Sequence, residues 1–324
     1  MLVTRRNAMA AAVVATISAP ERSEAGRVPL GERRTESTNE AAEDRQVVIN
    51  GVPVHYESRG SGQPIVMIHG FTLDRRSLIG CMEPVFSSRG GWRRIYFDLP
   101  GMGRTPASAA IASSDAMLDV VLNFIDAVIP GKRFSVVGQS YGGYLARGVL
   151  ARKPASIDGM ALICPVVVAE RDRRDLPPHA VIAKDAAFLA SLSGADADAF
   201  TPNFVVQNRS TWLRFQEELL PAIRRADQPL LESIARRYVF SFDPDALTRS
   251  FTGPVLVLTG RQDSDVGYRD QWKMSENFPR ATFAMLDRAG HGLAIEQAGL
   301  LTVLAQEWLD RVTEASGHFA ADAR

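Results

Sequence analysis

The strongest chemical signal in this chain is a serine in a glycine-rich turn, Gly138-Gln139-Ser140-Tyr141-Gly142. The turn follows an apolar run at residues 134–137, typical of a strand, and precedes a helical pattern at residues 144–151. Between a strand and a helix, such a turn is so sharp that glycines must flank the serine, whose hydroxyl is then exposed. Chance alone can produce the five-residue pattern, so it is this context that predicts Ser140 to be a nucleophile.

A serine hydroxyl becomes an effective nucleophile only when a base removes its proton and a third group orients the base. For a serine in this type of turn, the expected chain order is serine, acid, histidine. The chain has five histidines, and only His291 and His318 follow the last candidate acids. His318 lies in the final residues, where nothing would hold an imidazole, whereas His291 closely follows a strand-like run at residues 282–286. We therefore predict His291 as the base.

The acid is expected at the end of the preceding strand. Asp263 lies just beyond the apolar run at residues 255–258, after a glycine that allows the chain to turn. Asp265 is two residues further on, and spacing alone does not separate the two carboxylates. We prefer Asp263 because it is nearer to the strand end, where the backbone position is best determined. Its role would be to hold the imidazole tautomer and to stabilise the imidazolium.

Attack on a carbonyl also requires hydrogen-bond donors for the developing oxyanion. The backbone N–H of Tyr141, directly after the serine, is one expected donor. We predict that the second is the N–H of Phe71, in the loop His69-Gly70-Phe71-Thr72 that follows an apolar run at residues 65–68. His69 is expected to brace this loop through hydrogen bonds rather than to take part in catalysis.

Short apolar runs alternate with helical patterns from residue 46 onward. Asn50-Gly51, between runs at residues 47–49 and 52–56, is a strong hairpin signal and predicts an antiparallel edge at the start of the sheet. Further strand-like runs occur at residues 65–68, 94–97, 134–137, 160–163, 255–258 and 282–286. The alternation predicts an α/β fold with a mostly parallel sheet flanked by helices.

This alternation is interrupted at residues 166–250. Helical patterns occur there at residues 180–192, 210–223 and 229–238. An all-helical insertion before the acid-bearing strand would lie as a cap over the carboxyl edge of the sheet, where open parallel sheets bind ligands. We therefore predict a core made of residues 46–165 and 251–315, a helical cap at 166–250 and a tail at 316–324.

The first 45 residues are expected to lie outside the folded core. Arg5-Arg6 precedes an apolar stretch at residues 8–19, which is too short to span a bilayer as a helix. These features predict a twin-arginine-like signal for export to the periplasm or secretion, followed by a polar linker. The alternative is an alanine-rich extension on a cytoplasmic protein.

The balance of charge excludes several classes of partner. Lys plus Arg and Asp plus Glu both number 37, so no strong field would attract nucleic acid or an anionic membrane. Cys81 and Cys164 are far apart, show no metal-ligand spacing and are expected to be buried thiols. We therefore expect a small-molecule substrate and neither a metal nor an organic cofactor, and leave the oligomeric state open.

Together these motifs resemble those of α/β-hydrolase-fold serine hydrolases with a helical cap. The matching segments occur in the order of that family over residues 46–315 and are His69-Gly70-Phe71, Asp98-Leu99-Pro100-Gly101-Met102-Gly103-Arg104-Thr105, the turn around Ser140, Gly260-Arg261-Gln262-Asp263 and Gly290-His291. The loop from Asp98 to Thr105 is expected to be structural. Haloalkane dehalogenases and epoxide hydrolases of this fold have an aspartate at the position of Ser140, so the chain resembles neither.

The resemblance implies cleavage of an ester-type bond in a small, largely apolar substrate through an acyl-enzyme on Ser140. Aromatic residues of the predicted cap are consistent with an apolar pocket, and include Phe188, Phe204, Trp212, Phe215 and Tyr238. Carbon–carbon bond hydrolases and cofactor-free perhydrolases share the same layout and remain alternatives. A further alternative from another class is a non-catalytic ligand-binding protein on this fold.

Overall fold

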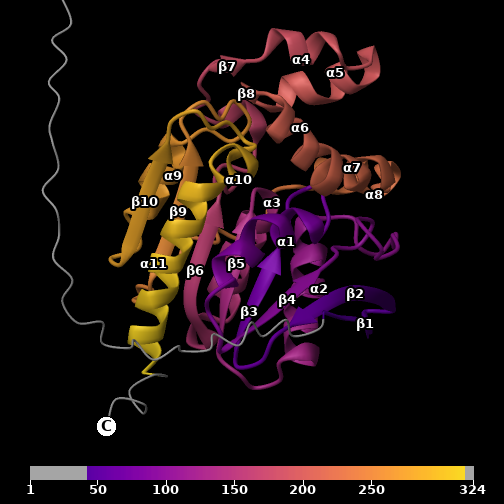
Figure 1. Cartoon of the computed structure of the whole chain (residues 1–324). Helices are drawn as coiled ribbons and strands as arrows, with labels where there is room; N and C mark the ends of the chain where they lie inside the picture. The colour runs from indigo at the N-terminus through magenta and orange to yellow at the C-terminus, as the bar shows by residue number, and fades with distance from the viewer. Residues whose placement is uncertain (1–41, 318–324) are drawn as a thin grey trace, which may run out of the picture. The chain divides into compact units, whose positions relative to one another are not determined.

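The computed structural model describes residues 42–317 of the chain and has an eight-stranded sheet at its centre (Figure 1). Its strands, in chain order, are β1 (Glu43–Ile49), β2 (Val52–Arg59), β3 (Gln63–Ile68), β4 (Trp92–Phe97), β5 (Phe134–Gln139), β6 (Ile157–Ile163), β9 (Val255–Gly260) and β10 (Ala281–Leu286). They lie in the order β1-β2-β4-β3-β5-β6-β9-β10. β2 pairs antiparallel with β1 and β4, and the other neighbours are parallel. The predicted mostly parallel sheet with an antiparallel edge is confirmed.

The hairpin at the start of the sheet turns at Asn50 and Gly51, whose φ angles are 50° and 80°. Positive φ at both central residues is what a two-residue hairpin turn with the twist of its strands requires. β1 begins at Glu43, so the predicted boundary at residue 46 is wrong. The strand starts with exposed polar and charged residues on a sheet edge, and an edge of that composition carries no hydrophobic pattern.

Helices flank the sheet, as predicted. Those outside the long insertion are α1 (Arg76–Met82), α2 (Ser114–Val128), α3 (Tyr141–Arg152), α9 (Arg269–Ser275), α10 (Leu293–Glu296) and α11 (Ala298–Ser316). α1 packs with α11, and α2 packs with α3. α11 ends one residue beyond the predicted core boundary, where Gly317 takes a left-handed conformation with φ of 67°. Residues 318–324 of the predicted tail (316–324) and residues 1–41 of the predicted signal-like segment and linker (1–45) lie outside the described residues.

The insertion between β6 and β9 lies above the carboxyl-terminal ends of the parallel strands in Figure 1. It contains α4 (Ala186–Ala190), α5 (Gly194–Phe200), α6 (Arg209–Arg214), α7 (Leu220–Arg225) and α8 (Gln228–Arg236). It also contains two short parallel strands, β7 (Ala183–Lys184) and β8 (Val206–Gln207), so the prediction of an all-helical insertion is wrong in this detail. Two-residue strands are too short to produce a readable alternation of polar and apolar side chains.

Residues 42–317 contain two hydrophobic clusters. The larger one fills the space between the sheet and its helices. The smaller one belongs mainly to the insertion and consists of Phe188, Phe200, Phe204, Trp212, Phe215 and Leu220. The part of the insertion up to Leu220 therefore has a packing cluster of its own, whereas Leu230, Leu231 and Ile234 of α8 belong to the larger cluster. Between residues 42 and 317, no helix has the length and apolarity needed to cross a membrane.

Candidate active site

Ser140 occupies a strained turn between β5 and α3. Its φ and ψ angles are 53° and −115°, a conformation that a non-glycine residue rarely adopts. A Cβ atom on Gly142 would lie 1.9 Å from the carbonyl oxygen of Ile68, and one on Gly138 would lie 2.4 Å from the carbonyl oxygen of Gly142. Only glycine fits at these two positions. The turn therefore has the sharp form that the sequence predicted.

The structure brings the three predicted side chains together. His291 lies in the loop after β10, and its Nε2 is 2.9 Å from the Oγ of Ser140. Its Nδ1 is 2.9 Å from Oδ2 of Asp263, which follows β9. Strand ends on one edge of a parallel sheet thus deliver a serine, an imidazole and a carboxylate into one hydrogen-bonded chain. Such a chain allows the imidazole to take the serine proton while the carboxylate stabilises the resulting charge.

The two candidate acids occupy different environments. Asp263 is fully buried, and its Oδ1 accepts hydrogen bonds from the N–H groups of Asp265 (2.9 Å) and Val266 (3.0 Å), which leaves Oδ2 for His291. Asp265 is partly exposed and pairs with Arg171. Its Oδ2 is 4.0 Å from Nε2 of His291, the nitrogen that faces Ser140. Asp263 is therefore the carboxylate placed to orient the imidazole, and Asp265 can act on it only through charge.

The carboxylates determine the protonation of His291. Burial lowers the pKa of the imidazole, but the charge and hydrogen bond of Asp263, together with the charge of Asp265, outweigh this effect and raise the pKa to about 9. The protonated form is thus favoured around neutral pH in the resting site. A base must be neutral to accept a proton, so the fraction of competent molecules increases with pH.

The loop that carries Phe71 lies directly against the serine turn. A Cβ atom on Gly70 would be 3.3 Å from the Cβ of Ser140, and the rings of Phe71 and Tyr141 meet edge to face with their centroids 5.2 Å apart. Within the described part of the chain, neither the N–H of Phe71 nor that of Tyr141 is hydrogen-bonded to another residue. Both groups remain the predicted oxyanion donors.

His69 braces this loop from beneath. It is fully buried, its Nδ1 donates to the carbonyl oxygen of Gly70 (2.8 Å), and its Nε2 accepts from the N–H of Leu99 (2.9 Å). This pair of partners assigns the proton to Nδ1. Burial lowers the pKa of His69, which is consistent with a neutral ring. The bracing role expected for His69 agrees with this geometry.

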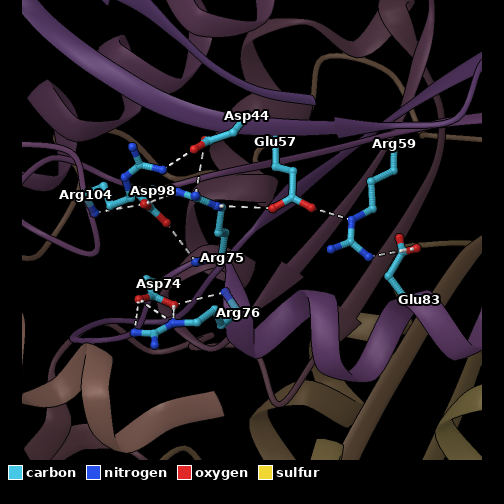
Figure 2. A network of polar contacts seen from close by, with 9 residues as sticks. All are labelled: Asp44, Glu57, Arg59, Asp74, Arg75, Arg76, Glu83, Asp98 and Arg104. Atoms are coloured by element: carbon cyan, nitrogen blue, oxygen red, sulfur yellow. Dashed lines mark hydrogen bonds and ion pairs between the residues drawn. The ribbon is translucent and has the colours of Figure 1, made fainter. Parts of the chain in front are cut away.

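A network of ion pairs holds the same loop from the side of β1 and β2 (Figure 2). Asp98 is buried and accepts from the N–H (3.0 Å) and guanidinium (2.5 Å) of Arg75 and from the N–H of Arg104 (2.9 Å). Arg75 in turn lies 3.7 Å from Glu57 on β2 and 3.3 Å from Asp44 on β1. Sequence reasoning identified the Asp98 loop as structural but missed Arg75, whose partners are too distant in sequence to produce a local signal.

Comparison with known proteins agrees with this geometry. The family model described as the alpha/beta hydrolase fold matches residues 63–298, which is more than half of the chain. The chain belongs to the α/β-hydrolase fold family. It is thus an enzyme of a hydrolase family, as the sequence predicted.

The proteins to which this α/β hydrolase is similar include enzymes with different named activities. It is 22% identical to the 2-hydroxymuconate semialdehyde hydrolase of a Pseudomonas species, covering 84% of this chain and 95% of that protein. It is 26% identical to the pimeloyl-[acyl-carrier protein] methyl ester esterase of Nitrosomonas europaea, covering 74% of this chain and 92% of that protein. A solved α/β-superfamily hydrolase from Oenococcus oeni is similar with a TM-score of 0.76 and 28% identity, covering 83% and 99% of the two chains.

Two cavities of this α/β hydrolase reach Ser140. One, of about 440 Å³, lies between His291 and the insertion. Its walls include the apolar residues Phe204, Val205, Phe215, Leu219, Ile223 and Ile295. The same cavity has polar residues that sequence reasoning did not single out, among them His179, Asn203 and Glu218. The second, of about 840 Å³, is bordered by Tyr238 and by several arginines, including Arg171 and Arg174.

The predicted aromatic residues divide between the cavities and the packing of the insertion. Phe204 and Phe215 line the first cavity, and Tyr238 lines the second. Phe188 and Trp212 belong to the aromatic cluster of the insertion and line neither of these two cavities. The walls are therefore more mixed in polarity than the aromatic composition of the insertion indicated.

Cys164 completes a group of three potential metal ligands with Asp263 and His291, all within 4.8 Å of one another. Both nitrogens of His291 already have partners, as do both oxygens of Asp263. Burial and the nearby charge of Asp263 raise the pKa of the Cys164 thiol well above its usual value. A metal prefers the thiolate. The chemistry of this group therefore favours hydrogen bonding over metal binding.

Proposed function

We propose that this α/β hydrolase cleaves an ester-type acyl bond of a small substrate through an acyl-enzyme on Ser140. The observation that supports this proposal most directly is the hydrogen-bonded chain from Ser140 through His291 to Asp263, with both distances at 2.9 Å. A ligand-binding protein would have no use for a base and an acid arranged behind a strained serine. We therefore favour catalysis over simple binding.

In the proposed reaction, Oγ of Ser140 attacks the acyl carbon while Nε2 of His291 takes the hydroxyl proton. The N–H groups of Phe71 and Tyr141 stabilise the oxyanion of the tetrahedral intermediate. The bond to the leaving alcohol then breaks, and the alcohol departs with the proton from His291. Water attacks the acyl-enzyme by the same route, which releases the acid and returns the proton to Ser140. We propose that the insertion acts as a cap over this site and limits access of bulk water.

Labelling with a fluorophosphonate probe tests the nucleophile. We expect stoichiometric labelling of the folded wild-type protein at Ser140 and none in Ser140→Ala. For the best ester substrate, Ser140→Ala and His291→Ala should each lower kcat by about 10⁴-fold or more, with unchanged circular dichroism. Substantial turnover by either folded variant would rule out the proposed triad.

Carbon–carbon bond hydrolysis is the second candidate, because a relative named 2-hydroxymuconate semialdehyde hydrolase covers 84% of this chain. A panel of aryl esters with short and long acyl chains, assayed beside a vinylogous diketone, separates the two reactions. Our proposal expects turnover of at least one ester class at a higher kcat/KM than the diketone. Turnover of the diketone with every ester inert would assign the chain to carbon–carbon hydrolysis instead.

A further inference from the structure

Glu296, at the end of α10, connects the loop of His291 to the insertion. Its Oε2 accepts a hydrogen bond from the N–H of Gly290 (2.7 Å), the residue immediately before His291. Its Oε1 accepts from the N–H groups of Val205 (2.6 Å) and Val206 (3.0 Å) at the start of β8. One side chain thus joins the segment of Val205 and the segment of Gly290, which are far apart in the sequence.

The two segments are also packed against each other on both sides of His291. A Cβ atom on Gly290 would lie 3.1 Å from Cγ1 of Val205, and one on Gly292 would lie 2.5 Å from the ring of Phe204. Both covalent neighbours of the imidazole residue therefore touch the insertion. Any displacement of Phe204 or Val205 would be transmitted to the backbone that carries His291.

The bonding of Glu296 is matched to a carboxylate rather than to an amide. All three partners are N–H donors, and a carboxylate offers only acceptors, whereas a glutamine side chain would turn a donor towards one of the two ends. Burial raises the pKa of Glu296 above its usual value, and the hydrogen bonds from Gly290, Val206 and Val205 offset only part of this effect. Charge-assisted bonds of this kind are about twice as strong as neutral ones.

We infer that Glu296 is a positioning residue that couples the insertion to the base: it keeps the imidazole of His291 aligned with Ser140 and Asp263 through Gly290, and only while β8 is in place. This inference rests on the proposed function in one respect, namely that His291 is the base. Loss of the coupling should affect the alignment of the imidazole more than the affinity for substrate. Misplacement of a reacting group by about 1 Å can lower a rate by about 100-fold.

The test compares Glu296→Gln with a matched variant, Glu307→Gln. Glu307 is on α11, is half-exposed and forms an ion pair with Arg311 on the same helix. In Glu296→Gln we expect the limiting kcat at high pH, where His291 is neutral in both proteins, to fall about 10- to 100-fold with a smaller change in KM. We also expect the pKa of His291, followed by NMR, to move from about 9 towards 6.5 as its bond to Asp263 loosens. Glu307→Gln should keep the wild-type kcat and the wild-type pKa of His291.

Hydrogen exchange provides a readout that needs no substrate. The amides of Gly290, Val205 and Val206 should exchange with similar opening free energies in the wild type and faster in Glu296→Gln. Glu296→Asp, whose shorter carboxylate cannot reach both segments, should release one end and show an intermediate loss of kcat. If neither variant folds, clearly different opening free energies for the three wild-type amides would refute the coupling.

The result that would overturn the inference is a folded Glu296→Gln protein with wild-type kcat, wild-type exchange and an unchanged pKa of His291. A lower Tm with those three quantities unchanged would also overturn it, because Glu296 would then be a structural residue only. Failure of the proposed function can be distinguished from failure of this inference. A catalytically active Ser140→Ala variant would refute the proposed function, whereas the NMR and exchange measurements on Glu296→Gln test the role of Glu296 independently.

Discussion

At the scale of single residues, the charges near the imidazole of His291 determine the pH at which this histidine is neutral. Asp263 is fully buried and bonded to Nδ1, whereas Asp265 is partly exposed and 4.0 Å from Nε2. Both raise the pKa of the imidazole, which burial alone would lower. Removing the charge of Asp265 should therefore change the pH dependence of activity without breaking the hydrogen bonds that connect Ser140, His291 and Asp263.

Asp265→Asn tests this role. Removal of the charge should lower the pKa of His291, so the acid limb of the profile of kcat/KM against pH should shift to lower pH and activity at pH 7 should increase. We expect a shift of roughly half a pH unit, since a partly exposed charge pair contributes up to about 1 kcal/mol. Asp119→Asn, an exposed carboxylate on α2, is the matched control and should leave the profile unchanged. A shift to higher pH in Asp265→Asn would contradict the assignment.

At the scale of elements, the turn between β5 and α3 depends on the close approach of β3. A Cβ atom on Gly142 would lie 1.9 Å and 2.5 Å from the carbonyl oxygens of Ile68 and His69, which are backbone atoms that cannot rotate away. The same contact brings the turn of Ser140 next to the loop of Phe71. The geometry of the turn at Ser140 and the position of the predicted oxyanion donor Phe71 thus have one cause.

A pair of glycine-to-alanine changes measures the cost of disturbing that contact. Gly142→Ala should destabilise the fold by about 1–3 kcal/mol or more, because the added methyl group forces backbone shifts. Gly299→Ala on α11 is the control, since a Cβ atom there meets nothing within 4 Å, and it should stabilise by about 0.4–1 kcal/mol. Urea unfolding of both variants and the wild type gives the two values. Equal stability of Gly142→Ala and the wild type would show that the contact is not as tight as the structure has it.

The insertion shows what local patterns can and cannot predict about elements. Its predicted helix at residues 210–223 is present as α6 and α7, separated by a π-helical turn at Phe215–Leu219. Pro221 lacks the N–H that would continue a regular helix, which accounts for the irregularity just before it. The predicted helix at residues 180–192 begins only at Ala186, because Asp185 caps it through the N–H of Phe188 and the preceding residues form β7.

At the scale of the whole molecule, protonation of His291 is linked to stability. Because the folded pKa of about 9 lies above the ordinary value of 6.5, the imidazolium stabilises the folded state. Because the folded pKa is raised, this stabilisation decreases as the pH increases. The contribution is complete below about pH 6.5 and is lost as the pH increases through about 9.

Thermal unfolding of His291→Gln tests this linkage. The difference in Tm between the wild type and His291→Gln should decrease between pH 6.5 and pH 9.5. Ser140→Ala keeps both His291 and Asp263, so its Tm should follow the wild-type dependence over the same interval. A difference that increased with pH would mean that the imidazole is held in its neutral form, and the assigned direction of the pKa shift would be wrong.

The sequence by itself determined where the strands of the sheet lie along the chain and where the turn at Ser140 occurs, and it pointed to His291 as the predicted base. These features depend on local spacing, since apolar periodicity and glycine positions reflect the backbone geometry of each short segment. Elimination then left His291 as the only histidine that a strand end could deliver to the site.

Only the tertiary structure decided which of Asp263 and Asp265 contacts the imidazole, how Arg75 and Asp98 hold the loop of Phe71, and that Glu296 joins β8 to Gly290. These contacts are made by side chains whose partners are distant in sequence. The direction in which these side chains point depends on packing between elements, and such packing produces no periodic pattern in the sequence. The serine and the histidine of the predicted triad could therefore be identified from the sequence and Asp263 preferred as the acid, but most of the contacts that align these side chains could not.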